Sequence, residues 1–397
     1  MKLFGPSLVQ FPLATLLGFS LVTACGDDTP ESDAGVADTG ARDATVVPDS
    51  GVRDSGPRDT GGGNDASGPD SGMQAEYCVE NEIIESPGGD IDLGGSASTV
   101  ATNATGNRAN VSCIDRGPPT TLLGNIRFEG CLIFSGTAPT RAALASSLET
   151  ALFYEVHPQT NEVVDPSFDH STGLNRGTPL NVTVEVRDNA PQCASGLQLE
   201  IGAQAPGVFT DVTYTFRVRS STTGGEWMTT YVQGILARAD VAGGGGCTPS
   251  TCRFAFNLPL FRRSEVQAMI TTSGVNIPGS ANLDDGQGPG YAFVAARDCT
   301  DSALQHAVVG FSAAPAAEGY LSAQSQFDAA LETTSSSGLY AGLGFTITSS
   351  LGRTLHGGVG VQRFQNECTE GFGQRAFRVY PDALSLVFFG RETVFNQ

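Results

Sequence analysis

The chain has 397 residues, of which 42 are acidic and 22 basic, and its formal net charge at pH 7 is −20. Nucleic acid and anionic membrane surfaces are bound through clustered positive charge, so this composition argues against both as partners. Lys2 is the only lysine, which leaves the rest of the chain without a phosphate-loop lysine, a Schiff-base lysine or a Ser–Lys nucleophile pair.

Residues 1–24 begin with a basic residue and continue as an uncharged, mainly apolar stretch, which is typical of a secretory signal. The stretch is also long enough to span a bilayer, so an uncleaved anchor is the alternative. Residues 22–25, Val-Thr-Ala-Cys, resemble the lipobox of bacterial lipoproteins. This resemblance implies a lipid on Cys25 and a location in the cell envelope, and Gly26 after it indicates the outer membrane.

Residues 25–75 are rich in Asp, Gly, Ser and Pro and contain almost nothing apolar to bury. Such a segment cannot compensate for the entropy lost on folding, so we predict a disordered acidic tether. A calcium-binding repeat is the alternative, because Asp supplies oxygen ligands. However, the Asp-Gly triplets lack the spacing of an EF-hand and the fixed period of a calcium-bound β-roll.

The chain has nine cysteines, and eight remain if Cys25 carries lipid. An even number in an exported protein predicts a disulfide framework. Zinc is the alternative, but the cysteines form no C-x2-C pair and no histidine stands at ligand spacing beside them, so we predict no metal. Proximity along the chain predicts four pairs: Cys78–Cys113, Cys131–Cys193, Cys247–Cys252 and Cys299–Cys368.

The remaining chain contains many short segments in which apolar and polar residues alternate, separated by Gly, Asn, Asp and Ser turns, as in an all-β protein. We expect two disulfide-stabilised antiparallel β-sandwich domains after the tether. The first, with an N-terminal extension, covers 76–250, a connector covers 251–288, and the second covers 289–397. The expected strands are 125–134, 150–157, 180–187, 210–219, 226–238, 290–297, 307–313, 338–349, 357–364, 374–380 and 383–391.

One strand shows the alternation clearly. In 210–219 we expect a buried face and an exposed face, each of four side chains: Val212, Tyr214, Phe216 and Val218 against Thr213, Thr215, Arg217 and Arg219.

Two segments favour helix. Residues 140–152 are amphipathic at their start and lead directly into a strand. Residues 262–274 have apolar side chains at helical spacing, with Ser264 expected as N-cap and Gly274 as the end. The glycine-rich stretch 282–290 then reads as a hinge into the second domain.

The second domain resembles the carboxypeptidase regulatory-like family, through residues 294–299, 307–311 and 337–341 within 290–391. The resemblance implies a seven-stranded, transthyretin (prealbumin)-like sandwich, and the first domain resembles a more divergent copy. The chain departs from the family pattern at 300–304, which lacks the turn Gly and Pro, and at Ser337, where Asp is usual. Family members serve mostly as spacers, binding modules or appendages of enzymes, so the resemblance implies no catalytic set.

Candidate sites are few, and we predict no catalytic residue and no cofactor. Asp169 and His170 are a possible metal or base pair, although neighbouring residues in an extended loop point in opposite directions, which favours a solvated loop. Asp284 and Asp285 are either calcium ligands or a charged turn. None of the histidines lies in a metalloprotease pattern: His157, His170, His306 and His356.

The segment GEWMTTYVQG places Trp227 and Tyr231 on one face of an expected strand. On an outer face the two rings would form a stacking platform for a carbohydrate or a protein ligand, and on an inner face they would be core. This pair is the one ligand site that the sequence suggests.

Together these features favour a non-enzymatic, lipid-anchored cell-envelope protein that presents β-sandwich domains for binding or structural roles. Two alternatives belong to other classes. One is an accessory or targeting subunit of an envelope hydrolase, and the other is a hydrolase whose site is assembled from loops.

Overall fold

The structure is a computed structural model. It describes residues 83–84, 90–93, 97–110, 127–134, 137–191, 193, 195–203, 212–222, 224–236, 253–255, 258–281, 283, 286–298, 302–323, 326–328, 330–349, 351–362, 365 and 369–389. The expected signal segment 1–24, the tether 25–75 and Cys25 lie outside these residues. In the described part of the chain, neither helix has the length and apolar character needed to cross a membrane.

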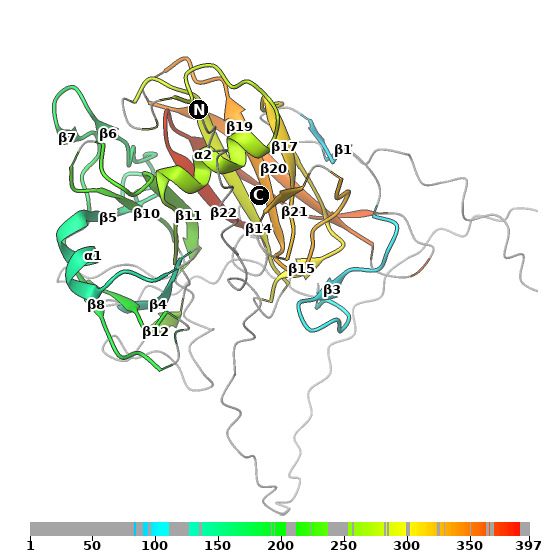
Figure 1. The fold of residues 1–397 in the computed structure, drawn as a ribbon, viewed down its shortest axis with the longest axis horizontal. Coiled ribbons are helices and arrows are strands. Elements are labelled where there is room, and N and C mark those ends of the chain that lie inside the picture. The colour runs from blue at the N-terminus through cyan, green and yellow to red at the C-terminus, as the bar shows by residue number, and fades with distance from the viewer. Residues whose placement is uncertain are drawn as a thin grey trace, which may run out of the picture. The chain divides into compact units, whose positions relative to one another are not determined.

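The structure confirms the all-β fold class, and its central element is a mixed sheet of eight strands (Figure 1). In spatial order the strands are β18 (Phe327–Asp328), β17 (Ala317–Leu321), β19 (Leu339–Phe345), β14 (Gly290–Ala296), β22 (Leu384–Phe389), β11 (Thr230–Leu236), β10 (Thr213–Ser220) and β5 (Leu148–Tyr154).

Strands from both expected domains share this sheet. β11, in the range 76–250, pairs in parallel with β22, in the range 289–397, and β22 pairs in parallel with β14. The strands β11, β22 and β14 lie side by side in Figure 1. The described residues, from 83 to 389, accordingly belong to one compact unit, so the two expected sandwiches are joined through their sheet and not only through a connector.

The centre of the sheet is buried on both faces, as parallel strands usually are. All seven residues of β14 are buried. Tyr291 and Phe293 face one hydrophobic cluster, whereas Ala292 and Val294 face another. A strand that reads as continuously apolar, GYAFVAA, is the sequence signature of this position.

A five-stranded sheet contributes to the first cluster. Leu132, Phe134, Leu199 and Ile201 from this sheet belong to the same cluster as Phe216 of β10. The strands are β12 (Arg253–Ala255), β4 (Arg127–Phe134), β9 (Gln198–Ala203) and β8 (Val182–Arg187), with β13 (Leu258–Leu260) also paired to β4.

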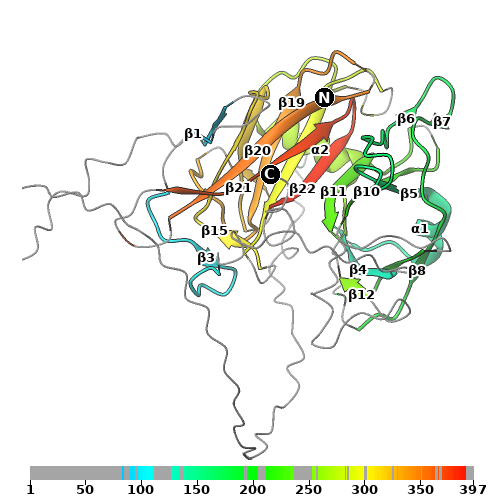
Figure 2. The ribbon, with the colours of Figure 1, turned by 180° about the vertical axis from the view of Figure 1, so that it is seen from behind.

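A three-stranded sheet contributes to the second cluster, on the other face of β14 (Figure 2). Its strands are β16 (Val308–Phe311), β20 (Arg353–Val361) and β21 (Glu370–Val379). Three two-stranded pairs complete the described strands: β1 (Ile83–Ile84) with β2 (Ile91–Asp92), β3 (Thr102–Asn103) with β15 (Leu304–Gln305), and β6 (Phe168–Asp169) with β7 (Leu174–Asn175).

Both expected helices are present among the described residues, and both differ in detail. α1 (Arg141–Ser147) is shorter than expected because β5 begins directly at residue 148. α2 (Arg263–Thr272) has Arg262, not Ser264, as its N-cap. The carboxylate of Glu265 accepts a hydrogen bond from the Arg262 backbone N–H at 2.8 Å, which satisfies a donor that the helix leaves free.

The face of β10 that was expected to be exposed is partly buried. Tyr214, Phe216 and Val218 enter the first cluster as predicted, but Thr215 and Arg217 are buried as well. The guanidinium of Arg217 donates a hydrogen bond to the carbonyl of Pro166 at 2.8 Å. The segment before β6 therefore lies over this face, a contact between residues that are remote in the sequence.

Candidate functional site

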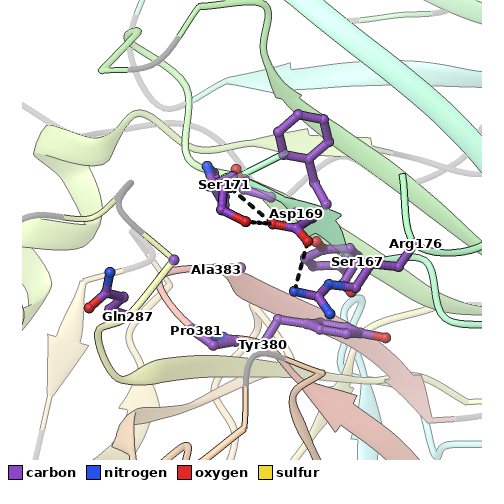
Figure 3. Close-up of a pocket in the computed structure, with 13 residues that line it drawn as sticks. Ser167, Asp169, Ser171, Arg176, Gln287, Tyr380, Pro381 and Ala383 are labelled. Atoms are coloured by element: carbon purple, nitrogen blue, oxygen red, sulfur yellow. Dashed lines mark hydrogen bonds and ion pairs between the residues drawn. The ribbon is translucent and has the colours of Figure 1, made fainter. Parts of the chain in front are cut away.

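The structure contains a cavity of about 250 Å³ beside the β6–β7 hairpin (Figure 3). Its wall is contributed by four segments: residues 167–171 with Arg176, Thr229 and Tyr231 at the start of β11, residues 286–287, and residues 380–383. We call it the hairpin cavity. Its lining combines hydroxyl, carboxylate, guanidinium, amide and phenol groups.

Asp169 organises the hairpin by closing the turn that joins β6 to β7. Its Oδ1 accepts hydrogen bonds from the backbone N–H of Ser171 at 2.9 Å, the hydroxyl of Ser171 at 2.6 Å and the N–H of Thr172 at 3.3 Å. Its Oδ2 lies 3.4 Å from Nη2 of Arg176, and Figure 3 shows Asp169 between Ser171 and Arg176. The Ser171 hydroxyl, with the backbone donors and Arg176, lowers the pKa of this carboxyl.

Arg217 of β10 attaches the β6–β7 hairpin to the eight-stranded sheet. Its guanidinium donates to the carbonyl of Pro166 and, at 2.6 Å, to Oδ1 of Asn175 in β7. The same group lies 5.6 Å from the ring centroid of Phe168, a cation–π contact. Burial lowers the pKa of Arg217, and Tyr231 and Glu149 oppose that shift.

Two stacked phenols and Ala383 form a small apolar cluster at the base of the cavity. The ring centroids of Tyr231 and Tyr380 lie 4.1 Å apart, and both residues are 3% exposed. Burial raises the pKa of Tyr231 to about 12 and that of Tyr380 well above its usual range. Both phenols therefore remain neutral at ordinary pH.

A tight turn at Asp382 fixes the opposite wall. Asp382 adopts a left-handed φ of 49°. Its Oδ2 accepts hydrogen bonds from the backbone N–H groups of Gln287 at 3.0 Å and Gly288 at 2.9 Å. At Gly286 a Cβ would lie 2.8 Å from Cδ2 of His170, so the absence of a side chain there allows the imidazole its close approach.

Of the two alternatives for Trp227 and Tyr231, a stacking platform or core, their burial supports core. Trp227 is 2% exposed and belongs to the first cluster, where its Nε1 donates to the hydroxyl of Ser147 at 3.2 Å. Tyr231 belongs to the separate cluster at the base of the cavity. The strand begins at Thr230, after the tryptophan, so the alternation on which the expectation depended does not extend to Trp227.

The predicted disulfide Cys131–Cys193 is confirmed, with a Cα–Cα distance of 5.2 Å. It joins β4 to the turn before β9, and these two strands are neighbours in the five-stranded sheet. The other candidates lie outside the described residues: Cys78, Cys113, Cys247, Cys252, Cys299 and Cys368.

The four histidines occupy separate places. His157 follows β5, where its Nδ1 accepts hydrogen bonds from the backbone N–H groups of Gln159 and Thr160 at 3.3 Å. His306 has a left-handed φ of 62°, and His356 lies in β20. His170 lines the hairpin cavity together with Asp169, so the structure brings this sequence-predicted pair to one wall.

Within the described residues no three His, Cys, Asp or Glu side chains are grouped so that they could hold a metal ion. Asp284 and Asp285, the possible calcium ligands, lie outside the described residues.

Sequence reasoning missed Ser167, Arg176, Gln287 and Tyr380. No motif connects these residues, because they come from separate segments and meet only through the fold. A weak signal for the hairpin was present in FDHSTG, since Asp followed by Ser and Thr favours a side-chain-capped turn.

The fold and the cavity define an all-β protein with a small polar cavity at the end of a shared sheet. No protein-family model, curated protein or solved structure matches the chain. The resemblance of 290–391 to the carboxypeptidase regulatory-like domain therefore stays a prediction from the sequence.

Proposed function

We propose that this protein is a non-enzymatic, lipid-anchored protein of the cell envelope that binds a small polar ligand in the hairpin cavity. The observation that carries the binding function is the convergence of polar side chains from four segments on one hollow of ligand size. The lipobox-like sequence at Cys25 and the acidic segment 25–75 support anchoring through a lipid and a tether.

The lowered pKa of Asp169 favours binding over acid–base catalysis. A general base works best when its pKa lies near the operating pH. The hydrogen bonds from Ser171 and Thr172 and the ion pair with Arg176 shift the pKa of Asp169 in the opposite direction, away from neutrality. The carboxylate is therefore suited to holding the hairpin and accepting hydrogen bonds, and poorly suited to taking up a proton.

The binding function is tested by a thermal-shift screen of the full chain against small sugars, amino acids, nucleosides and carboxylates. We expect at least one class to raise the melting temperature. Gln287 is exposed on the cavity wall, so Gln287→Trp should abolish the shift. Gln159→Trp, a matched change at another exposed position, should retain it. A screen without any shift, or a shift that survives Gln287→Trp, contradicts the proposal.

Anchoring is tested separately by expressing the wild-type chain and Cys25→Ala in a bacterium that exports lipoproteins. We expect the wild type in the membrane fraction with a diacylglycerol mass on Cys25, and the variant in the soluble fraction. Equal distribution of the two proteins would contradict the lipid anchor.

A further inference from the structure

The wall of the hairpin cavity pairs one carboxylate with one guanidinium. Asp169 and Arg176 form an ion pair within its wall, at 3.4 Å, and are about equally exposed at 23% and 27%. Oδ1 of Asp169 already accepts three hydrogen bonds from Ser171 and Thr172. Neither an anion nor a cation finds an unmatched opposite charge in this pair, and the net charge of −20 further disfavours an anion.

One residue of the wall, Ser167, has a buried hydroxyl without a protein partner. Ser167 is 2% exposed, and its Oγ makes no hydrogen bond in the structure. The backbone of Ser167 is fully used, since its N–H donates to Asp165 at 3.0 Å and its carbonyl accepts from Arg176 at 3.0 Å. Buried hydroxyls are rarely left without a partner, so this atom points to a ligand group that donates to it or accepts from it.

The polar groups of the wall suit a ligand with several hydroxyls better than a ligand with one charged group. Arg176 donates, Asp169 accepts, and the amide of Gln287 and the hydroxyl of Ser167 can do both. A ligand that presents several adjacent hydroxyls can likewise donate and accept at each position. The base adds an apolar surface of Tyr231, Tyr380 and Ala383, which suits the C–H face of a sugar ring.

The size of the cavity limits the ligand. Sites for drug-sized molecules enclose about 300–1,000 Å³. The hairpin cavity, at about 250 Å³, is smaller, so it suits one ring and not an extended chain. We infer that the hairpin cavity binds a single neutral, hydroxyl-rich ring, that is, one uncharged sugar unit, with the Ser167 hydroxyl as a direct contact. This inference rests on the proposed binding function and specifies its ligand class.

The test is isothermal titration calorimetry on the full chain with five probes at concentrations up to about 10 mM, because a ring-sized ligand is expected to bind in the millimolar range. The neutral probes are glucose, galactose and N-acetylglucosamine, and the charged probes are glucuronate and glucosamine. We expect at least one neutral probe to bind, and both charged probes to bind at least about tenfold more weakly because each leaves a charge without a partner.

Two matched serine variants distinguish a hydroxyl that contacts the ligand from a hydroxyl that only stabilises the fold. Ser167→Ala removes a hydroxyl without a protein partner, so affinity for the neutral probe should fall about three- to tenfold while the melting temperature stays equal or rises. Ser337→Ala removes a buried hydroxyl that, from the turn before β19, donates to the carbonyl of Leu321 in β17 at 3.0 Å, and neither residue lines the cavity. Its melting temperature should fall while affinity stays unchanged.

Three results would overturn the inference. Tighter binding of a charged probe would show that the ligand class is wrong, while leaving the binding function intact. Absence of binding by all five probes would also exclude the sugar ligand, and the broader thermal-shift screen would then decide the binding function separately. A melting temperature that falls as far in Ser167→Ala as in Ser337→Ala would show that the Ser167 hydroxyl is structural.

Discussion

Gly234 in β11 lies against Arg375 of β21, so a strand of the first expected domain meets a strand of the second here. It has a left-handed φ of 81°, and a Cβ built on it would overlap Nη1 of Arg375 in β21. The Arg375 side chain is 1% exposed and forms an ion pair with Glu155 at the end of β5. Glu155 also accepts a hydrogen bond from the backbone N–H of Gly234 at 2.6 Å. Gly234→Ala should therefore disturb a buried ion pair as well as the backbone.

The expected loss of stability in Gly234→Ala has two parts. A Cβ in the left-handed region costs about 1–2 kcal/mol. Displacing Arg375 separates a buried charge from its partner Glu155, and breaking such a pair costs about 3–5 kcal/mol. We therefore expect Gly234→Ala to lower the free energy of unfolding by about 4–7 kcal/mol, a large part of the stability of an ordinary domain.

The assay is equilibrium unfolding in guanidinium chloride, followed by the fluorescence of Trp227. This residue is the only tryptophan and is 2% exposed, so its emission reports loss of the core. The matched control is Gly373→Ala in β21, where a Cβ meets no atom within 4 Å. The control should change stability by less than about 1 kcal/mol.

A double-mutant cycle isolates the role of Arg375. In an Arg375→Ala background the guanidinium is absent, so Gly234→Ala should cost only its backbone part, about 1–2 kcal/mol. A stability of Gly234→Ala within about 1 kcal/mol of the Gly373→Ala control, or an equal cost in both backgrounds, would show that the new Cβ does not displace Arg375.

Three further predictions concern the disulfide, the cavity and a histidine. The Cys131–Cys193 bridge spans 62 residues, so Cys131→Ala/Cys193→Ala should lower the free energy of unfolding by about 4 kcal/mol, and an unchanged denaturation midpoint would contradict this. Asp169→Asn leaves Arg176 without its ion-pair partner, so calorimetry should show glucuronate gaining affinity relative to glucose. Burial lowers the pKa of His356, so the unfolded state binds more protons. The stabilisation due to the neutral His356 should be fully present above about pH 6.5 and should be lost as the pH falls through the lowered pKa. In melting-temperature scans, His356→Gln should lack this part of the decrease at low pH.

The strands were predictable because their signal is local. The alternation in 210–219 reports which side chains of β10 enter the core, and Tyr214, Phe216 and Val218 do so. The same pattern could not show that Arg217 is buried. Its partners Pro166 and Asn175 lie 51 and 42 residues away in the sequence, and alternation contains no information on what covers the polar face.

The site was predictable only in fragments. The sequence indicated Asp169 and His170 as a possible metal or base pair, and both residues line the cavity. The sequence could not show that Asp169 pairs with Arg176 across a hairpin or that Ser167 has a buried hydroxyl. The sequence also could not place the start of β11: Trp227 is buried, as the core alternative requires, but it precedes the strand, which begins at Thr230.

Hydrophobic alternation and cysteine proximity act over short stretches of chain, so the sequence was enough to predict the all-β class, most strands of four or more residues and the Cys131–Cys193 pair. The pairing of β11 with β22, and the hydrogen bond from Gln233 to the carbonyl of Arg378, 145 residues away, became visible only in the folded chain. These contacts depend on which buried faces fit together in three dimensions. The hairpin cavity arises from the same long-range packing, so its residues could be assembled into a site only once the fold was known.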